Sequence, residues 1–166
     1  VDWNLQYQTV SDRAQRISQR SFIELAKKKK AYMKTSPVLW CTECQTSIAQ
    51  AELETKECET VFNYLNFTTP IGNLLIATTR PELLAGCACI FVHPDDTRYK
   101  KFIGQKAIVP LYDFEIPILA DDTVAMDKGT GVVMCASFGD SADVEWYQKH
   151  KLTSKEVILA DGTISE

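Results

Sequence analysis

The spacing of apolar residues changes along the chain, and the change falls near residue 58. Between residues 11 and 33, apolar side chains recur every three or four positions, which is typical of one face of an amphipathic helix. Ser11 or Asp12 has a side chain suited to cap the start of this helix. We expect Ser36-Pro37 to break it, because the residue before a proline avoids the α region.

After residue 58 the chain consists of short apolar runs that turn residues separate. The runs are Val61–Phe67, Leu74–Thr78, Ala88–Val92, Lys106–Val109, Ile116–Leu119, Thr123–Met126, Val132–Cys135 and Val157–Leu159. Their spacing predicts a compact sheet or barrel. One helix near Ser141–His150 interrupts the series, with Val144 and Tyr147 or Trp146 on its inner face. We therefore predict an α+β fold: a β-barrel-rich domain with a few peripheral helices over residues 58–166, preceded by a helix and a Cys-x-x-Cys ribbon over residues 1–57.

Composition is that of a soluble globular protein. The chain has 166 residues, of which 45% are hydrophobic and 24% charged, and this length allows a sizeable core. No signal peptide and no apolar run of membrane-spanning length is visible, so we expect a cytoplasmic protein without a membrane partner. The net charge of −4 argues against a basic nucleic-acid binder of the usual kind. An acidic domain can still bind an RNA end if a larger assembly supplies the positive surface.

Two of the six cysteines have the spacing of metal ligands. Cys41 and Cys44 form a Cys-x-x-Cys pair, which is half of a zinc site. A structural zinc needs four ligands, and Cys87, Cys89 and Cys135 lie in apolar runs, where cysteine behaves as a small hydrophobic residue. The pair is therefore either half of a site completed outside this sequence or a plain reduced pair.

The residues of a covalent mechanism are missing from the sequence. There is no Gly-x-Ser-x-Gly segment and no glycine-rich phosphate loop. The two histidines, His93 and His150, fall in a turn and at a helix end, so a catalytic triad is not expected.

The first segment that can carry chemistry is Ala77–Glu82. Thr78 and Thr79 place two hydroxyls between a strand-like run and a short helix that Pro81 opens. Taken alone, such a pattern is more often β-branched strand residues followed by a helix cap.

The second segment runs from Gly129 to Asp143. A tight glycine turn leads into a strand, and the strand leads into a helix that Asp140 fits as N-cap. Capping explains Asp143 less well, because a capping box favours Glu or Gln at the third helical position. Two close carboxylates at this corner can hold a cationic ammonium group. A metal is a third option, although no histidine or further acid joins them locally.

Several segments, taken in order, resemble the editing domains of valyl-tRNA synthetases. They are Ala77–Glu82, Val92–Asp96, Pro117–Asp121, Gly129–Gly131 with Asp140 and Asp143, and the upstream ribbon Val38–Glu54. The resemblance covers essentially the whole chain. Isoleucyl and leucyl enzymes share the architecture, but Arg80-Pro81-Glu82 together with His93-Pro94-Asp95 favours the valyl type. Phe138-Gly139-Asp140 and Trp146-Tyr147 are similar to its archaeal-type branch.

The resemblance implies an editing domain over residues 58–166 that residues 1–57 link to the body of an ATP-binding synthetase. Its partners would be the misacylated 3′ end of tRNA(Val) and the remainder of that enzyme, and its reaction would be the hydrolysis of threonyl-tRNA(Val). The ester is already activated, so a positioned water suffices and no cofactor is needed for hydrolysis. A structural zinc remains an option for the full-length enzyme.

The resemblance also implies roles for individual residues. Asp143 would bind the substrate α-ammonium, and Asp140 would assist it or cap the helix. Thr78 and Thr79 would hold the terminal adenosine or orient the water, with Thr79 counted among the catalytic residues. Arg80 would contact the adenosine or lock the loop through an acid. Further candidate substrate contacts are Glu82, Phe138 and Gly139.

The sequence departs from the valyl pattern in the pocket for the side chain. Leu83, Met134 and Ala136 stand where many bacterial enzymes have polar residues, so the partner of a threonine hydroxyl must come from elsewhere. The candidates are Asp140, which is our first choice, Ser137, and a backbone carbonyl near Phe138 and Gly139. Two alternatives stay open: an editing domain of isoleucyl or leucyl type, and a non-catalytic zinc-ribbon module that binds RNA or a partner.

Overall fold

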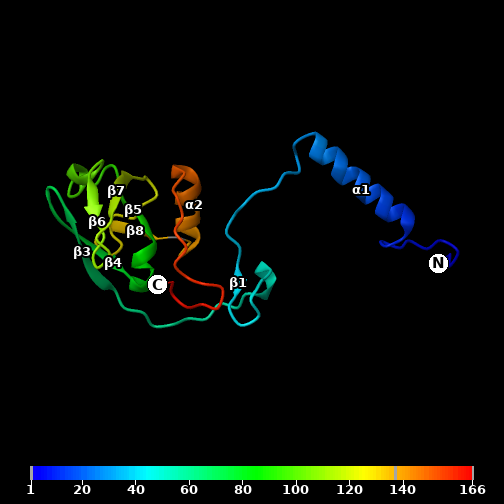
Figure 1. Cartoon of the computed structure of the whole chain (residues 1–166), viewed down its shortest axis with the longest axis horizontal. Coiled ribbons are helices and arrows are strands. Elements are labelled where there is room, and N and C mark those ends of the chain that lie inside the picture. The colour runs from blue at the N-terminus through cyan, green and yellow to red at the C-terminus, as the bar shows by residue number, and fades with distance from the viewer. Residues whose placement is uncertain (1, 137, 166) are drawn as a thin grey trace. The chain divides into compact units, whose positions relative to one another are not determined.

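The computed structural model describes residues 2–136 and 138–165, and their contacts divide them into two units (Figure 1). One unit ends at Ser36 and the other begins at Pro37. The ribbon belongs to the second unit, in which the Trp40 indole Nε1 donates a hydrogen bond of 2.9 Å to the carbonyl of Ala160. The boundary near residue 58 stays a prediction.

The first unit is built on one helix, α1 (Asp12–Lys27). The Ser11 hydroxyl caps it by accepting a hydrogen bond from the backbone N–H of Ala14 at 3.3 Å. The expectation that this helix continues to residue 33 and breaks at Ser36-Pro37 is wrong. Lys29 adopts a left-handed conformation with φ +56°, which an α-helix cannot accommodate. Neither α1 nor the other described helix combines the length and the apolar character that crossing a membrane requires.

The second unit contains a six-stranded mixed sheet. Its strands are β3 (Asn63–Thr69), β4 (Gly72–Thr78), β5 (Cys87–Val92), β6 (Lys106–Ile108), β7 (Glu115–Ala120) and β8 (Val132–Ala136). Their order is β4-β3-β6-β7-β5-β8, and only the β5–β7 pair is parallel. The edge strands β4 and β8 also contact each other, so the sheet forms a nearly closed barrel. The predicted α+β class with a β-rich barrel is confirmed.

Two apolar clusters stabilise the barrel. The larger one fills it with alternate side chains of the strands, which is the period-two pattern of a half-buried sheet. Its members include Phe67, Leu74, Ile76, Ile90, Val92, Ile116, Ile118 and Val132. The smaller one lies where helix α2 (Ser141–His150) packs on β5 and β8, and it contains Cys89, Phe91, Cys135, Trp146 and Tyr147. The rings of Phe91 and Trp146 are 4.9 Å apart, so α2 is held against the barrel by aromatic packing.

Short elements connect the strands. The ribbon is a hairpin of β1 (Trp40–Cys41) and β2 (Thr46–Ser47), and the 3₁₀ turns are η1 (Gln50–Glu52), η2 (Pro81–Gly86) and η3 (Lys100–Phe102). Pro81 opens η2 as expected, because its fixed φ suits the first helical position. On α2 the buried residues are Asp143, Trp146 and Tyr147, whereas Val144 is only half-buried.

Two expected strands are absent from the described part of the chain. Thr123–Met126 is a loop, because the Asp121 carboxylate accepts the backbone N–H of Thr123 at 3.0 Å and turns the chain there. Val157–Leu159 is not a strand either, since only one isolated bridge forms there, between Ile158 and Ile164.

Candidate functional site

A cavity of about 350 Å³ lies where the end of β4 meets the beginning of α2. Its polar lining includes Thr78, Thr79, Arg80, Lys128, Asp140 and Asp143, and its apolar lining includes Phe62, Leu83, Met134, Ala136 and Trp146. The fold therefore brings the two segments singled out in the sequence to one site.

The threonine side of the cavity is a turn at the end of β4. The Thr78 hydroxyl accepts the backbone N–H of Arg80 at 3.1 Å, which leaves its own proton free to be donated. Arg80 then spans the site: its Nε donates to the Glu82 carboxylate at 3.0 Å and its terminal nitrogen donates to the Gly139 carbonyl at 2.7 Å. Arg80 thus ties the turn after β4 to the turn before α2.

The carboxylate side of the cavity is the first turn of α2. Asp140 is the N-cap, and its carboxylate accepts the backbone N–H of Asp143 at 2.9 Å. Asp143 is only 8% exposed. Burial, and after it the charge of Asp140, raises the pKa of the Asp143 carboxyl to about 6, although hydrogen bonds from the Cys135 thiol and the backbone at Asp140 and Ala136 act in the opposite direction. Among the ion pairs of the described residues, none includes Asp143.

The thiols near this carboxylate are unsuited to nucleophilic attack. A hydrogen bond with Cys89, followed by burial, raises the pKa of the Cys135 thiol, and burial raises the pKa of Cys87 well above its usual value. Both sulfurs therefore stay protonated at neutral pH. Nδ1 of His93 accepts a hydrogen bond from the backbone N–H of Asp95 at 3.1 Å, and Nε2 of His150 lies 2.6 Å from the Asp121 carboxylate. The arrangement favours chemistry by a bound water over chemistry by a side-chain nucleophile.

Similarity to known proteins identifies the family. The family model described as "tRNA synthetases class I (I, L, M and V)" matches residues 1–160. The chain belongs to the class I tRNA synthetases. Over 165 residues it is 48% identical to the valine–tRNA ligase of Rickettsia rickettsii. The matched region covers 99% of this chain and 20% of that protein. The valine–tRNA ligase of a Wolbachia species is 47% identical over 165 residues, covering 99% of this chain and 19% of the relative.

The chain thus spans about a fifth of the length of these relatives. Among solved structures, a LeuRS–tRNA–LeuAMS ternary complex from Agrobacterium radiobacter is similar over 59% of this chain and 16% of that chain, with 21% identity and a TM-score of 0.48.

Six of the synthetase chain's eight predicted catalytic and substrate-binding residues line the cavity: Thr78, Thr79, Arg80, Gly139, Asp140 and Asp143. Glu82 and Phe138 do not line it. Glu82 is held by Arg80, while Phe138 packs on Tyr147 with 5.0 Å between ring centroids and lines a second, neighbouring cavity of about 680 Å³ with Trp40. Ser137 lies outside the described residues.

Sequence reasoning missed the wall that the loop between β7 and β8 contributes. Thr123, Val124, Ala125 and Lys128 of this loop line the cavity. Our sequence-based expectation of a strand over Thr123–Met126 hid this, and the turn residues Lys128-Gly129 were the available signal that a loop lies there.

An ion pair between the buried Asp96 carboxylate and the largely exposed Arg98 side chain holds the far end of this loop. Asp96 is 4% exposed, and both its carboxylate oxygens accept hydrogen bonds from Arg98, at 2.7–3.2 Å. Arg98 also donates to the Met126 carbonyl at 2.8 Å. Gly131, with φ +82°, leaves the space that this contact needs, because a Cβ there would lie 2.6 Å from the Arg98 guanidinium.

Of the ribbon cysteines, Cys41 ends β1 and Cys44 lies in the β1–β2 turn, where its backbone N–H donates to the Cys41 sulfur at 3.4 Å. Hydrogen bonds from the backbone of Cys44 and Glu43 lower the pKa of the Cys41 thiol, which favours the thiolate that a metal binds. Across residues 2–136 and 138–165, no group of three or more His, Cys, Asp or Glu is placed to hold a metal. The described residues therefore contain no complete four-ligand zinc site.

Proposed function

We propose that this chain is the editing domain of a valine–tRNA ligase and that it hydrolyses threonyl-tRNA(Val). The observation that carries the proposal is Asp143: a buried carboxylate without a cationic partner among the described residues, in a cavity that two threonine hydroxyls share. Such a carboxylate is suited to bind the α-ammonium group that every aminoacyl ester carries.

In the proposed reaction, the ammonium of the substrate binds Asp143 and the ester carbonyl lies toward Thr78 and Thr79. The Thr78 hydroxyl has its proton available, because its oxygen already accepts the Arg80 N–H. That proton can be donated to the carbonyl oxygen or to the attacking water. The water oxygen adds to the carbonyl carbon, the ester bond to the ribose breaks, and the ribose oxygen leaves with a proton. The chain's own residues position the groups, so this hydrolysis needs no cofactor.

The need for such a step follows from the nearly equal size of threonine and valine. A hydrophobic pocket rejects an isostere with an extra hydroxyl poorly, and the valyl enzyme is itself the known example, at about a hundredfold for threonine against valine. A second, polar pocket can instead select threonine, because it pairs the hydroxyl group that valine lacks. In this cavity Leu83, Met134 and Ala136 are apolar, so we propose Asp140 as the partner of the threonine hydroxyl.

A deacylation assay tests the proposal directly. The chain is incubated with threonyl-, valyl- and isoleucyl-tRNA, and the release of each amino acid is measured. We expect threonyl-tRNA to be hydrolysed fastest. A preference for isoleucyl-tRNA would favour an isoleucyl-type or leucyl-type domain. Hydrolysis of none of them, with tightly bound stoichiometric zinc, would favour the non-catalytic zinc-ribbon module.

We further propose that the domain acts in the cytoplasm as part of the full-length enzyme, on the 3′ end of tRNA(Val). There, Cys41 and Cys44 would supply half of a structural zinc site. Metal analysis of the isolated chain should then give substoichiometric zinc, since two thiolates hold zinc poorly. Tight stoichiometric zinc that Cys44→Ser abolishes would contradict the half-site.

A further inference from the structure

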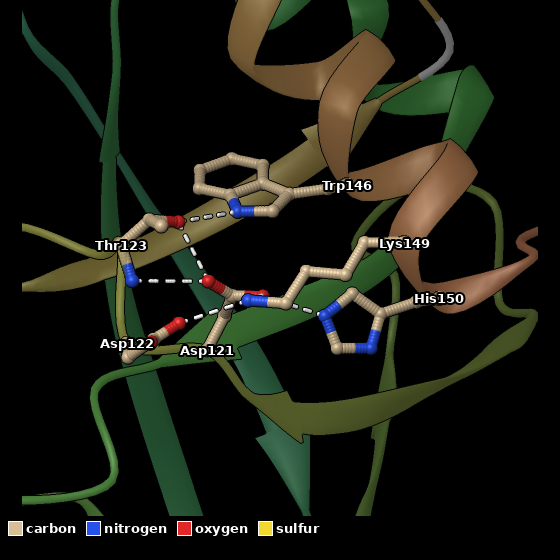
Figure 2. A network of polar contacts seen from close by, with 6 residues as sticks. All are labelled: Asp121, Asp122, Thr123, Trp146, Lys149 and His150. Carbon is tan, nitrogen blue, oxygen red and sulfur yellow. Dashed lines mark hydrogen bonds and ion pairs between the residues drawn. The ribbon is translucent and has the colours of Figure 1, made fainter.

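The last turn of α2 is fixed to the barrel by a network centred on Asp121, the residue after β7 (Figure 2). The side chain of Asp121 is fully buried. One of its oxygens accepts the Thr123 hydroxyl at 2.6 Å and the Thr123 backbone N–H at 3.0 Å. The other lies 2.6 Å from Nε2 of His150 and 2.9 Å from the Lys149 ammonium. Both of these partners belong to α2.

The same network reaches the cavity. The indole Nε1 of Trp146, in the middle of α2, donates to the Thr123 hydroxyl oxygen at 2.9 Å, and Figure 2 shows this contact beside the Asp121 carboxylate. Trp146 and Thr123 both line the cavity that contains Asp143. The chain of contacts from Asp121 through Thr123 to Trp146 is therefore also part of the wall of the candidate site.

Helix geometry connects the network to Asp143. Asp143, Trp146 and His150 are spaced three and four residues apart, so they project from one face of α2. A helix of ten residues is a short, stiff rod about 15 Å long. A shift or rotation of its last turn is therefore transmitted to its first turn, where Asp143 lies.

We propose that Asp121 is a positioning residue: through His150, Lys149 and the Thr123–Trp146 contact, it sets the placement of helix α2 and thereby aims the Asp143 carboxylate into the cavity. This inference rests on the proposed hydrolytic function for its kinetic consequence. Asp121 itself does not line the cavity, so its effect on the substrate is indirect.

Paired substitutions at His150 separate hydrogen bonding from packing. The imidazole also packs on the Phe91 ring, with 4.8 Å between centroids. His150→Phe keeps a ring there but removes the donor to Asp121, whereas His150→Gln keeps a donor and loses the ring. Asp121→Asn removes the charge at almost constant shape. Phe67→Leu is the matched control, because it loosens the core without touching the cavity or the network.

The full chain is assayed for kcat and KM with threonyl-tRNA, at a temperature where circular dichroism shows every variant folded. We expect Asp121→Asn and His150→Phe to lower kcat roughly 10- to 100-fold, as for a misplaced reacting group. KM should change by less than about twofold, because binding of the tRNA is not altered. His150→Gln should stay close to the parent, and Phe67→Leu should lower only the melting temperature.

A second readout does not depend on hydrolysis. The pKa of the Asp143 carboxyl, followed by carbon-13 NMR titration, should fall toward the ordinary aspartate value in Asp121→Asn and His150→Phe, because a displaced side chain regains solvent. If the parent chain hydrolyses nothing, the proposed function fails and this titration alone decides the positioning role. A parent-like kcat, or a parent-like Asp143 pKa, in both Asp121→Asn and His150→Phe overturns the inference.

Discussion

Helix α2 has a buried carboxylate near each of its ends, and the fold surrounds the two very differently. Asp121, against the last turn, contacts Thr123, Lys149 and His150. Burial on its own would raise the pKa of Asp121, but the hydrogen bonds from these three residues outweigh it and hold that pKa well below its usual value. Asp143, in the first turn, has no cation beside it in the described chain, and its pKa is raised to about 6.

The difference separates a structural carboxylate from one that is available to a ligand. A carboxyl whose pKa rises from its usual value to about 6 disfavours its charged form by about 3 kcal/mol in the folded protein. Capping the helix does not require this cost, because Asp140 already fulfils that role from an exposed position. A cationic ligand that binds Asp143 would recover the cost, which is the physical basis for assigning the substrate ammonium to it.

The largest expected effect is the loss of Asp143 itself. Asp143→Ala should slow threonyl-tRNA hydrolysis by roughly 30- to 1,000-fold, since losing an ammonium–carboxylate contact costs about 2–4 kcal/mol in the transition state. Single-turnover deacylation of the folded variant measures it. Glu145→Ala is the control, because Glu145 is an exposed acid of the same helix and the same cavity. A folded Asp143→Ala variant with the parent's rate would refute the assignment.

The next largest effect concerns Asp140, the exposed N-cap of α2. Asp140→Ala should reduce the preference for threonyl- over valyl-tRNA by about five- to 150-fold, because the bound threonine hydroxyl loses its proposed partner, and such a hydrogen bond contributes about 1–3 kcal/mol. The loss of the helix cap alone should cost about 1 kcal/mol of folding stability. Asp140→Asn keeps the cap and serves as the control. If Asp140→Ala melts as a lost cap predicts and keeps its preference for threonine, Asp140 is only a cap.

A third buried carboxylate, Asp96, extends the comparison to the loop between β7 and β8, which its partner Arg98 contacts at the Met126 carbonyl. Gly131→Ala should destabilise the chain by about 1–3 kcal/mol more than Gly104→Ala, because it also pushes Arg98 off a buried carboxylate. Both glycines have φ near +82°, and a Cβ at Gly104 meets nothing within 4 Å, so Gly104→Ala measures backbone strain alone. Urea unfolding gives both values. If both variants lose the same free energy of unfolding, a Cβ at position 131 is accommodated without weakening the Arg98–Asp96 ion pair.

The smallest effect on activity is a shift of a pH profile. Asp143 must be ionised to bind an ammonium, so kcat/KM should rise with pH and level off above about 6. Asp140→Asn removes the neighbouring negative charge, so its profile should move to lower pH. Deacylation rates measured from pH 5 to 8 test this. If kcat/KM of the parent chain shows no midpoint in this range, catalysis does not depend on the ionisation of Asp143.

The buried carboxylates of Asp143 and Asp121 should make the folding stability depend on pH in opposite directions. The folded state holds the Asp143 proton more tightly than the unfolded chain, so this residue makes stability fall as pH rises from about 4 to about 6. The lowered pKa of Asp121 contributes stability above about 4 that is lost as pH falls further. Asp143→Asn should abolish the first slope and Asp121→Asn should weaken the second.

The local elements of this protein were readable from the sequence. The period-two apolar runs located β3 to β8 to within a few residues, and Asp140 with the 3.6-residue pattern gave α2 its bounds. These signals are local, because strand alternation and helix capping depend on residues a few positions apart. The same reasoning failed where a side chain contact overrode propensity, as at Thr123–Met126, whose turn the Asp121 carboxylate imposes.

The relations between distant residues were decided only by the tertiary structure. The sequence offered Thr78 and Asp143 as separate candidates, and the closure of β4 against β8 places them in one cavity. His150 read from the sequence as a helix end, yet it lies 2.6 Å from the Asp121 carboxylate, 29 positions away. Burial and partners set how a carboxylate behaves, and both arise from strand register and helix packing, which no local pattern encodes.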